Sequence, residues 1–402
     1  MTSTHVEALA LANRLEEFLS GSLGDLRSLD GETRHKLSEA ARKVNFATES
    51  AGDTLNRIIY SPLQLPLAFI GLETRLFEIL VEHERGGATN AELASMTKVD
   101  PALMKRLLRY YQSFGMIDQP ADDQYRANAM TSAMVLRAAR SGVPFYFKAI
   151  APCLNALPQF LRDTKYANIT DENNAPWQRG QQTHKNPFDW FRDHPDIMEL
   201  FVPWMVSQRD GLPLFLEAMD FEKEFAGEGT NETTPVFVDI GGASGHQCVA
   251  LRQKHPNLVG RVILQDREEV IQQVNAHPIP GFEGIETQPH DFFTPQPVKG
   301  ARAYYMRNVL HDWPDHKCVE ILENIKSAMT EESRILIDEM VLPERGAPWR
   351  ATQLDFLMSC AAAAERSRDE WFALLDKAGL KILKIWKYTD ELDDCVIVAV
   401  PK

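Results

Sequence analysis

The chain has little basic charge and no long apolar run, and each absence excludes a class of protein. Its 402 residues hold 43 Lys and Arg against 57 Asp and Glu, a formal net charge of −14. Phosphate binding needs basic surface, so nucleic acid is not expected as the main partner. No window approaches the roughly 20 apolar residues that span a bilayer. The stretch from Met1 to Leu15 mixes charged with apolar residues, unlike a signal peptide. We therefore expect neither a membrane segment nor a secretory leader.

Cysteines are also few, and the five present are scattered, odd in number and without metal-ligand spacing. This usage is typical of a reduced intracellular protein rather than of a disulfide framework or a zinc site. We therefore predict a cytoplasmic protein without a metal. The five are Cys153, Cys248, Cys318, Cys360 and Cys395.

The N-terminal part of the chain is predicted to be helical. Residues 1–58 form a mostly polar helical segment that buries little by itself, so it should pack on another chain or domain. Beyond it, we expect one apolar helix over Leu63–Glu82 and a short helix, Asn90–Met96, capped by Thr89.

A third helix in this region is capped by Asp100 and ends at Gly115. Two short strands follow, at Met116-Ile117 and around Tyr125, on either side of a polar turn. This is a winged-helix pattern, which either binds DNA or serves dimerisation. The acidic balance and an attached cofactor fold favour dimerisation. The apolar face of the third helix is assigned to Leu103, Leu107, Leu108 and Tyr111.

Residues 130–225 are helical in pattern and rich in large aromatic side chains. Most of these rings should belong to the core, although so many beside a cofactor domain could also line a flat organic substrate. From residue 235 onward, strands alternate with helices, which predicts a mostly parallel sheet covered on both faces. The expected strands are Val236–Ile240, Arg261–Gln265, Gly284–Thr287, Ala303–Arg307, Ile335–Ile337, Leu380–Trp386 and Cys395–Val400.

These patterns divide the chain into three parts. Residues 1–130 form a helical and winged-helix dimerisation domain, and residues 131–230 a helical substrate-pocket and linker region. Residues 231–402 form the α/β domain. Ligands of such sheets lie beyond the carboxyl ends of the strands, where strand order reverses, so functional residues are sought there.

The first strand leads through Asp239 into a glycine loop. Gly241 and Gly242 permit positive φ, and with Gly245 they let the backbone approach a ligand closely. Asp266, at the end of the second strand, is placed to accept both hydroxyls of a ribose, although a helix N-cap is an equal alternative. Loop and acid together predict a nucleoside-type cofactor.

The remaining strand ends carry further candidates. Asp291 and Phe292 could bind an adenine amino group and cover its ring, although a surface turn also explains Asp291. His311 lies just beyond the fourth strand, where reacting atoms are expected, although a lone histidine is more often structural. The fifth strand ends in Asp338-Glu339, and a later loop carries Glu365. Both glutamates could reach His311 and stabilise its protonated form, or serve as ion-pair residues.

In combination these motifs resemble the small-molecule O-methyltransferases of the caffeate and flavonoid type, especially their fungal secondary-metabolism relatives. The resemblance covers roughly residues 60–402 and depends on motif order and spacing. The motifs are Val238–His246, Asp266, Asp291-Phe292, His311-Asp312-Trp313, Asp338-Glu339 and Glu365-Arg366-Ser367.

The resemblance implies a Rossmann-like domain that binds S-adenosylmethionine (SAM), with a mostly helical N-terminal winged-helix domain that builds an intertwined homodimer. It implies methylation of a phenolic or enolic hydroxyl on a small aromatic or polyketide-like secondary metabolite, with S-adenosylhomocysteine as product. The cofactor residues are then Asp239, Gly241, Gly242, Gly245, Asp266, Asp291, Phe292 and Arg307.

By the same resemblance, His311 deprotonates the substrate hydroxyl, and Glu339 and Glu365 flank it. Imidazole suits that task because it titrates near neutrality, whereas a free phenol titrates near pH ~10. The implied substrate-binding positions are Phe201, Met205, Asn308, Phe356 and Met358.

Two alternatives and one departure remain. Some fungal members of this fold keep SAM without transferring its methyl group and catalyse pericyclic or dehydration steps, with Arg307 suited to polarise a carbonyl. A DNA-binding regulator is the third hypothesis. Ala243 replaces the family's usual third glycine, a change that we expect to be mild at negative φ.

Overall fold

The computed structural model describes residues 3–22, 25–83, 87–209, 211–227 and 229–402. The chain divides into two compact units, Met1–Gln64 and Leu65–Lys402. The first contains the helices α1 (Ser3–Ser22), α2 (Gly31–Thr48) and α3 (Ala51–Tyr60), as predicted. Within the described part of this unit, α2 and α3 bury no residue. Among the described residues, no helix is long and apolar enough to cross a membrane.

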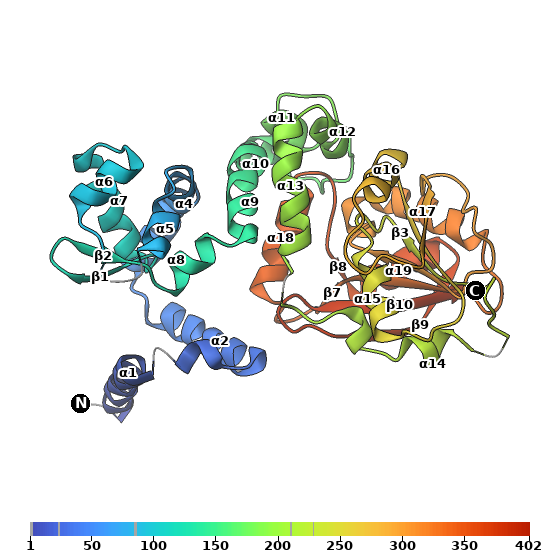
Figure 1. The fold of residues 1–402 in the computed structure, drawn as a ribbon, viewed down its shortest axis with the longest axis horizontal. Helices are drawn as coiled ribbons and strands as arrows, with labels where there is room; N and C mark the ends of the chain where they lie inside the picture. Colours follow the sequence, from blue (N-terminus) through green and yellow to red (C-terminus); the bar gives the residue numbers. More distant parts are fainter. Residues whose placement is uncertain (1–2, 23–24, 84–86, 210, 228) are drawn as a thin grey trace. The chain divides into compact units, whose positions relative to one another are not determined.

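The second unit begins with a winged-helix arrangement of helices followed by a two-stranded antiparallel wing (Figure 1). The predicted caps Thr89 and Asp100 are confirmed, because their side chains accept the first backbone N–H groups of their helices. The elements are α4 (Gln64–Glu73), α5 (Leu76–Glu82), α6 (Asn90–Thr97), α7 (Pro101–Ser113), β1 (Asp118–Ala121) and β2 (Gln124–Arg126).

Three predictions for this region are wrong in detail. The single helix over Leu63–Glu82 is broken at Arg75, whose left-handed φ of 59° separates α4 from α5. On α7, Leu103 is 47% exposed, and Met104 takes its place in the core. The first strand of the wing was predicted at Met116-Ile117 but begins at residue 118. Met116 and Ile117 are instead buried in the helical core before the strand.

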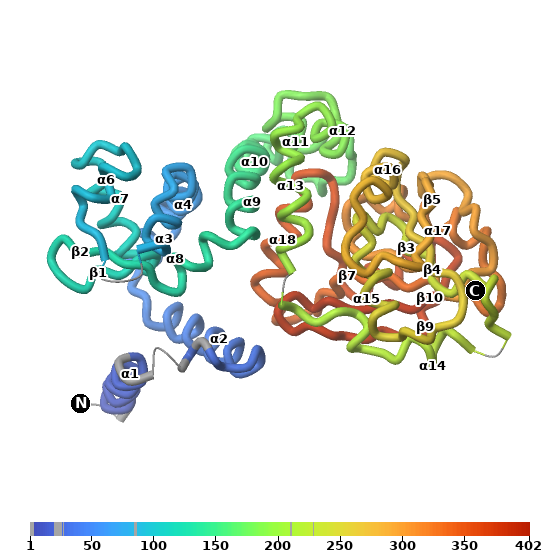
Figure 2. The backbone as a smooth tube through the Cα atoms, viewed as in Figure 1, coloured from blue at the N-terminus to red at the C-terminus, as the bar shows by residue number. Residues whose placement is uncertain are grey.

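The aromatic segment folds into short helices, most of which pack around one core. Its rings are mostly core, as expected, and Phe145, Trp177, Trp190 and Phe191 are buried there. Leu357 of α18 (Trp349–Ser359) packs on the same core, which places this late helix beside α13 (Figure 2). The helices are α8 (Ala129–Met134), α9 (Arg137–Phe145), α10 (Ala151–Asp163), α11 (Pro176–Gly180), α12 (Pro187–Arg192), α13 (Pro195–Ser207) and α14 (Phe221–Phe225).

The main sheet has the predicted α/β architecture. Its strand order is β5-β4-β3-β6-β7-β10-β9, parallel except for β10, which is antiparallel to both of its neighbours. Strand order reverses between β3 and β6, so ligands are expected beyond the carboxyl ends of these two strands. The strands are β3 (Pro235–Ile240), β4 (Arg261–Asp266), β5 (Ile285–Pro289), β6 (Ala303–Arg307), β7 (Arg334–Leu342), β8 (Arg366–Ser367), β9 (Leu380–Lys387) and β10 (Asp394–Pro401).

One strand boundary matters for the site. β7 does not end at Asp338-Glu339 but continues to Leu342, because β10 pairs with it as far as Met340. Asp338 lies in register with Arg307 on β6, and the short strand β8 pairs with β7 at Val341 and Leu342. The two acidic residues therefore lie within a paired, buried strand.

Helices cover both faces of the sheet. Val238 and Ile240 of β3 lie in one buried cluster, and Phe237, on the side of the opposite helices, lies in another. The first cluster includes residues from α17 and α19, and the second includes residues from α14, α15 and α16. This alternation is the period-two pattern of a strand buried on both sides. The helices are α15 (His246–Lys254), α16 (Glu268–Ala276), α17 (Asp315–Lys326) and α19 (Arg368–Lys377).

The glycine loop after β3 is held against β4. Gly241 and Gly245 adopt positive φ of 72° and 80°, whereas Gly242 does not. A methyl group at Gly242 would lie 2.5 Å from the Asp239 carboxyl and from a methyl carbon of Leu264. The negative φ that would make an alanine a mild change at the next residue is not present, because φ of Ala243 is 48°. Ala243 therefore carries the strain that a glycine would avoid.

The loop geometry predicts opposite effects for two substitutions. Gly242→Ala should lower the free energy of unfolding by about 1–3 kcal/mol through steric overlap and weaken SAM binding. Ala243→Gly should raise the free energy of unfolding by about 1 kcal/mol by relieving left-handed strain. Urea unfolding and calorimetric titration with SAM measure both. Gly227→Ala is the control, because nothing lies within 4 Å of its added methyl group. Equal effects of G242A and G227A would contradict this account.

Candidate active site

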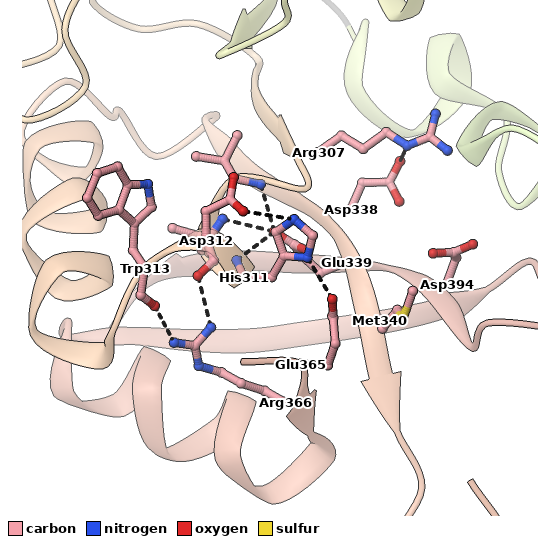
Figure 3. Close-up of polar contacts among 12 residues, drawn as sticks. Arg307, His311, Asp312, Trp313, Asp338, Glu339, Met340, Glu365, Arg366 and Asp394 are labelled. Carbon is pink, nitrogen blue, oxygen red and sulfur yellow. Dashed lines mark hydrogen bonds and ion pairs between the residues drawn. The ribbon is translucent and has the colours of Figure 1, made fainter. Parts of the chain in front are cut away.

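His311 lies on a buried single turn of 3-10 helix, η5 (Leu310–Asp312), directly after β6 (Figure 3). The amide end of this turn is closed by Glu339 of β7. One oxygen of Glu339, Oε1, accepts the backbone N–H groups of Val309 at 3.0 Å, Leu310 at 2.9 Å and His311 at 3.3 Å. Because helix amides lack partners at their first turn, a buried carboxylate here satisfies three donors at once.

The imidazole ring itself is held by Glu365. Nδ1 of His311 lies 2.7 Å from Oε1 of Glu365, and 3.9 Å from the second oxygen of Glu339. Nε2 lies 3.5 Å from Oδ1 of Asp312 and forms an ion pair with it when the imidazole is charged. Glu365 is held in turn by a bond from its N–H to Asp355 at 3.0 Å. The predicted group of one histidine and two glutamates is therefore brought together, with Nδ1 bound to Glu365 and Nε2 beside Asp312.

Buried carboxylates set the charge of this group. Burial lowers the pKa of His311, but the Glu365, Glu339 and Asp312 carboxylates outweigh burial and raise the pKa well above its ordinary value. Burial also raises the pKa of Glu339 and of Asp312, against the opposing effect of His311. The surrounding carboxylates therefore favour the charged form of the imidazole.

The same three residues are chemically suited to a divalent cation. Ligand atoms of His311, Glu339 and Glu365 lie within 4.8 Å of one another. Oε2 of each glutamate is buried and has no hydrogen-bond partner among the described residues. Imidazole and carboxylate are common ligands of transition metals. Methyl transfer by the implied mechanism needs no metal, and its absence from the reaction stays a prediction.

Arg307, at the end of β6, belongs to a second buried charge network. Its Nε lies 3.6 Å from Oδ2 of Asp338 on the adjacent strand. Burial lowers the pKa of Arg307, but Asp338 outweighs it, so the guanidinium stays charged. Asp338 also accepts hydrogen bonds from Tyr305 and Tyr388. The assignment of Arg307 as a cofactor contact stays a prediction.

The glycine loop and the neighbouring strand ends form the candidate cofactor site. Asp239 is buried beneath the loop, where Cys248 donates to it at 3.5 Å and burial raises its pKa to about 7. Asp266 accepts the N–H of Ala243 at 2.9 Å and of Arg267 at 2.8 Å. The alternative that Asp266 caps α16 is wrong, because the N-cap position is Arg267 and has no side-chain cap.

The loop after β5 supplies the aromatic side of this site. Phe292 lies 3.9 Å from the position of a methyl group on Gly241 and packs edge-on against Phe293 and Trp313. Asp291 is exposed and accepts the N–H of Phe293 at 3.0 Å, as in a surface turn. A ring facing a glycine backbone, beside the acidic end of β4, fits an adenosine-bearing cofactor.

The predicted substrate positions are less uniformly placed. Phe201 packs in the aromatic core, 4.8 Å between ring centroids from Phe191. Met205 is 38% exposed and Phe356 is 64% exposed, so neither lies in that core. Asn308 adopts φ of 51° two residues before the turn that carries His311. Met358, on α18, is partly buried. Their roles in binding stay predictions.

Sequence reasoning missed three polar residues at or near the site, Asp355, Arg209 and Asp394. Asp355 on α18 holds the backbone of Glu365, and Arg209 after α13 forms a buried ion pair with Asp394 on β10. These partners come from separate elements, so no spacing in the sequence signals them. Arg366 is different, because it lies inside a motif that the resemblance already singled out.

Comparison with known proteins gives a consistent result. Residues 226–381 match the model of the O-methyltransferase domain. The chain is 37% identical to O-methyltransferase lepI of Aspergillus flavus, over 90% of this chain and 93% of that protein. It is 35% identical to demethylsterigmatocystin 6-O-methyltransferase of Aspergillus parasiticus, over 93% and 94% of the two chains.

Solved structures agree with these relatives. The structure of LepI in complex with SAM superimposes with a TM-score of 0.89 at 35% identity, covering 99% of this chain and all of that one. A further match, with a TM-score of 0.88 at the same identity and coverage, is described as a pericyclic reaction enzyme. With a SAM complex of this fold at such similarity, the cofactor of the present chain is SAM. The protein therefore belongs to the family of SAM-dependent O-methyltransferases, with fungal secondary-metabolism enzymes among its relatives.

Proposed function

We propose that the protein transfers the SAM methyl group to a phenolic or enolic hydroxyl of a small aromatic or polyketide-like metabolite, with His311 as general base. The observation that carries this proposal is the 2.7 Å contact between Nδ1 of His311 and Glu365 in a buried cluster. It fixes the ring and leaves Nε2 as the nitrogen that can meet a hydroxyl.

Each residue then has a defined task. The glycine loop, Asp266 and Phe292 hold the cofactor, which when bound supplies a methyl group already activated on a sulfonium. The protein must therefore orient the hydroxyl and accept its proton. Nε2 of His311 takes that proton, and Glu365 stabilises the resulting imidazolium from Nδ1. General-base assistance of this kind contributes typically about 10²–10⁴-fold.

A second candidate is a reaction in which SAM is bound but not consumed. Its support is the similarity to a structure described as a pericyclic reaction enzyme. Arg307, kept charged beside Asp338, is suited to stabilise developing negative charge on a substrate oxygen. The complete His311, Glu339 and Glu365 group favours methyl transfer over a pericyclic step, because a pericyclic step abstracts no proton and has no need of a base.

The first test replaces the base. With a panel of phenolic and polyketide-like hydroxy compounds, His311→Asn should lower methyl transfer by about 10²–10⁴-fold and leave the SAM dissociation constant nearly unchanged. Mass spectrometry measures the product, one CH2 heavier, and S-adenosylhomocysteine. His316→Asn is the control, because His316 is 61% exposed on α17. Full methyl transfer by H311N would contradict the mechanism, and product formation with SAM unconsumed would favour the second candidate.

The pH dependence follows from the charge of the cluster. The pKa of His311 is raised, so its neutral form accumulates, and the rate should rise, only as pH increases through that raised value. Glu365→Gln removes one of the carboxylates that raise it, so the rising limb of kcat/KM should move to lower pH. Glu370→Gln, on the exposed side of α19, should leave the limb in place. A limb that stays in place or moves to higher pH in E365Q would contradict this assignment.

We further propose that the N-terminal unit forms a homodimer. Its helices expose apolar side chains, including Leu55 at 58% and Ile59 at 62% on α3, which a second copy would cover. Light scattering should give twice the chain mass of 45.5 kDa. Ile59→Glu should give the monomer mass, and Lys43→Glu on the exposed side of α2 should not. A monomeric native protein would contradict the proposal.

A further inference from the structure

The turn that carries His311 has its backbone polar groups satisfied from two directions. Its amides are bound by Glu339, as described above. Its carbonyls are bound by Ala364 and Arg366, the residues on either side of Glu365. The N–H of Ala364 donates to the carbonyl of His311 at 3.1 Å, while Glu365 takes Nδ1 and Arg366 takes two further carbonyls.

Arg366 makes the most extensive of these contacts. It is 4% exposed, and its Nη1 donates to the carbonyl of Leu310 at 3.0 Å, while Nη2 donates to that of Trp313 at 2.9 Å (Figure 3). Its Nε donates to Asp315 at 3.2 Å, and its guanidinium lies over the ring of Trp371. Each of its three nitrogens already has a protein partner.

We propose that Arg366 is a positioning residue for His311, which fixes the distance between the imidazole and Glu365 by holding the carbonyls on either side of it. The inference rests on the proposed function. Leu310 and Trp313 bracket His311 in the chain, so a rigid guanidinium bound to both restricts the turn between them. A lysine in this position presents a single ammonium and lacks the planar fork.

The position of Arg366 in the fold supports this role. β8 begins at Arg366 and pairs with β7, the strand that supplies Glu339. Glu365 directly precedes Arg366 in the chain. The start of β8 therefore positions both the carboxylate that contacts Nδ1 and the guanidinium that binds the turn. The thiol of Cys318 donates to the same two carbonyls, at 3.1 Å and 3.2 Å, but a thiol is a weak donor. Removal of Arg366 would leave the turn loosely held.

The first measurement uses cofactor-free protein. NMR titration of labelled histidines, with the His311 signal assigned by its loss in H311N, gives the imidazole pKa. In Arg366→Met this pKa should fall toward its ordinary value, because a loosened turn takes the ring away from Glu365 and Glu339. Arg252→Met is the matched control, because Arg252 also donates to two carbonyls, at 2.7 Å each, at a loop remote from His311 in sequence. An unchanged pKa in R366M would overturn the inference.

Kinetics provide a second, independent readout. R366M should lower kcat by about 10²-fold, the cost of a small misplacement of a reacting group, with the KM for SAM within about twofold of the wild type. In the H311N background, Arg366→Met should not lower kcat any further. An equal loss in both backgrounds, or an equal loss in R252M, would show a general structural role and overturn the inference.

Two outcomes keep the inference separate from the proposed function. If H311N retains full activity, the base assignment fails, while the NMR measurement still tests whether Arg366 positions the ring. If R366M does not fold, Arg366→Lys replaces it and should show a smaller fall in the pKa of His311 and a smaller loss of kcat. Wild-type values for both in R366K would overturn the requirement for a bidentate donor.

Discussion

The site depends on the burial of charge around one imidazole. Burying a carboxylate without partners costs several kcal/mol, so every such group must be paired or hydrogen-bonded. Glu339 is accommodated by three backbone amides, and Glu365 by the imidazole of His311. The turn that carries the imidazole is thus also the partner that makes the two buried glutamates tolerable. The contacts that stabilise the two buried glutamates are therefore also the contacts that hold the imidazole in place.

The sheet provides the register that this arrangement needs. β6 and β7 are parallel neighbours, so the residues that follow β6 lie beside Glu339 on β7. The antiparallel partner β10 extends β7 beyond that point, and the extension gives β8 an edge on which Arg366 is aligned. The acidic pair is therefore inside a strand rather than at its end. A glutamate at a free strand end would lack the neighbours that fix its direction.

Much of this could be predicted from the sequence, and the failures have physical causes. Apolar runs placed the seven strands of the main sheet other than β8 within a few residues, and the histidine and two glutamates proved to be neighbours. The break at Arg75 and the positive φ of Ala243 were missed, because tertiary contacts impose backbone conformations that local propensity disfavours. The pairing of Arg209 with Asp394 joins residues far apart in the chain, so no local pattern could reveal it.

The charge of the cluster also bears on why a cationic cofactor suits this site. Three carboxylates, from Asp312, Glu339 and Glu365, surround one imidazole. Even with the imidazole charged and one carboxyl protonated, the cluster carries a net negative charge. A cationic ligand held by the glycine loop, Asp266 and Phe292 would be attracted toward that negative charge.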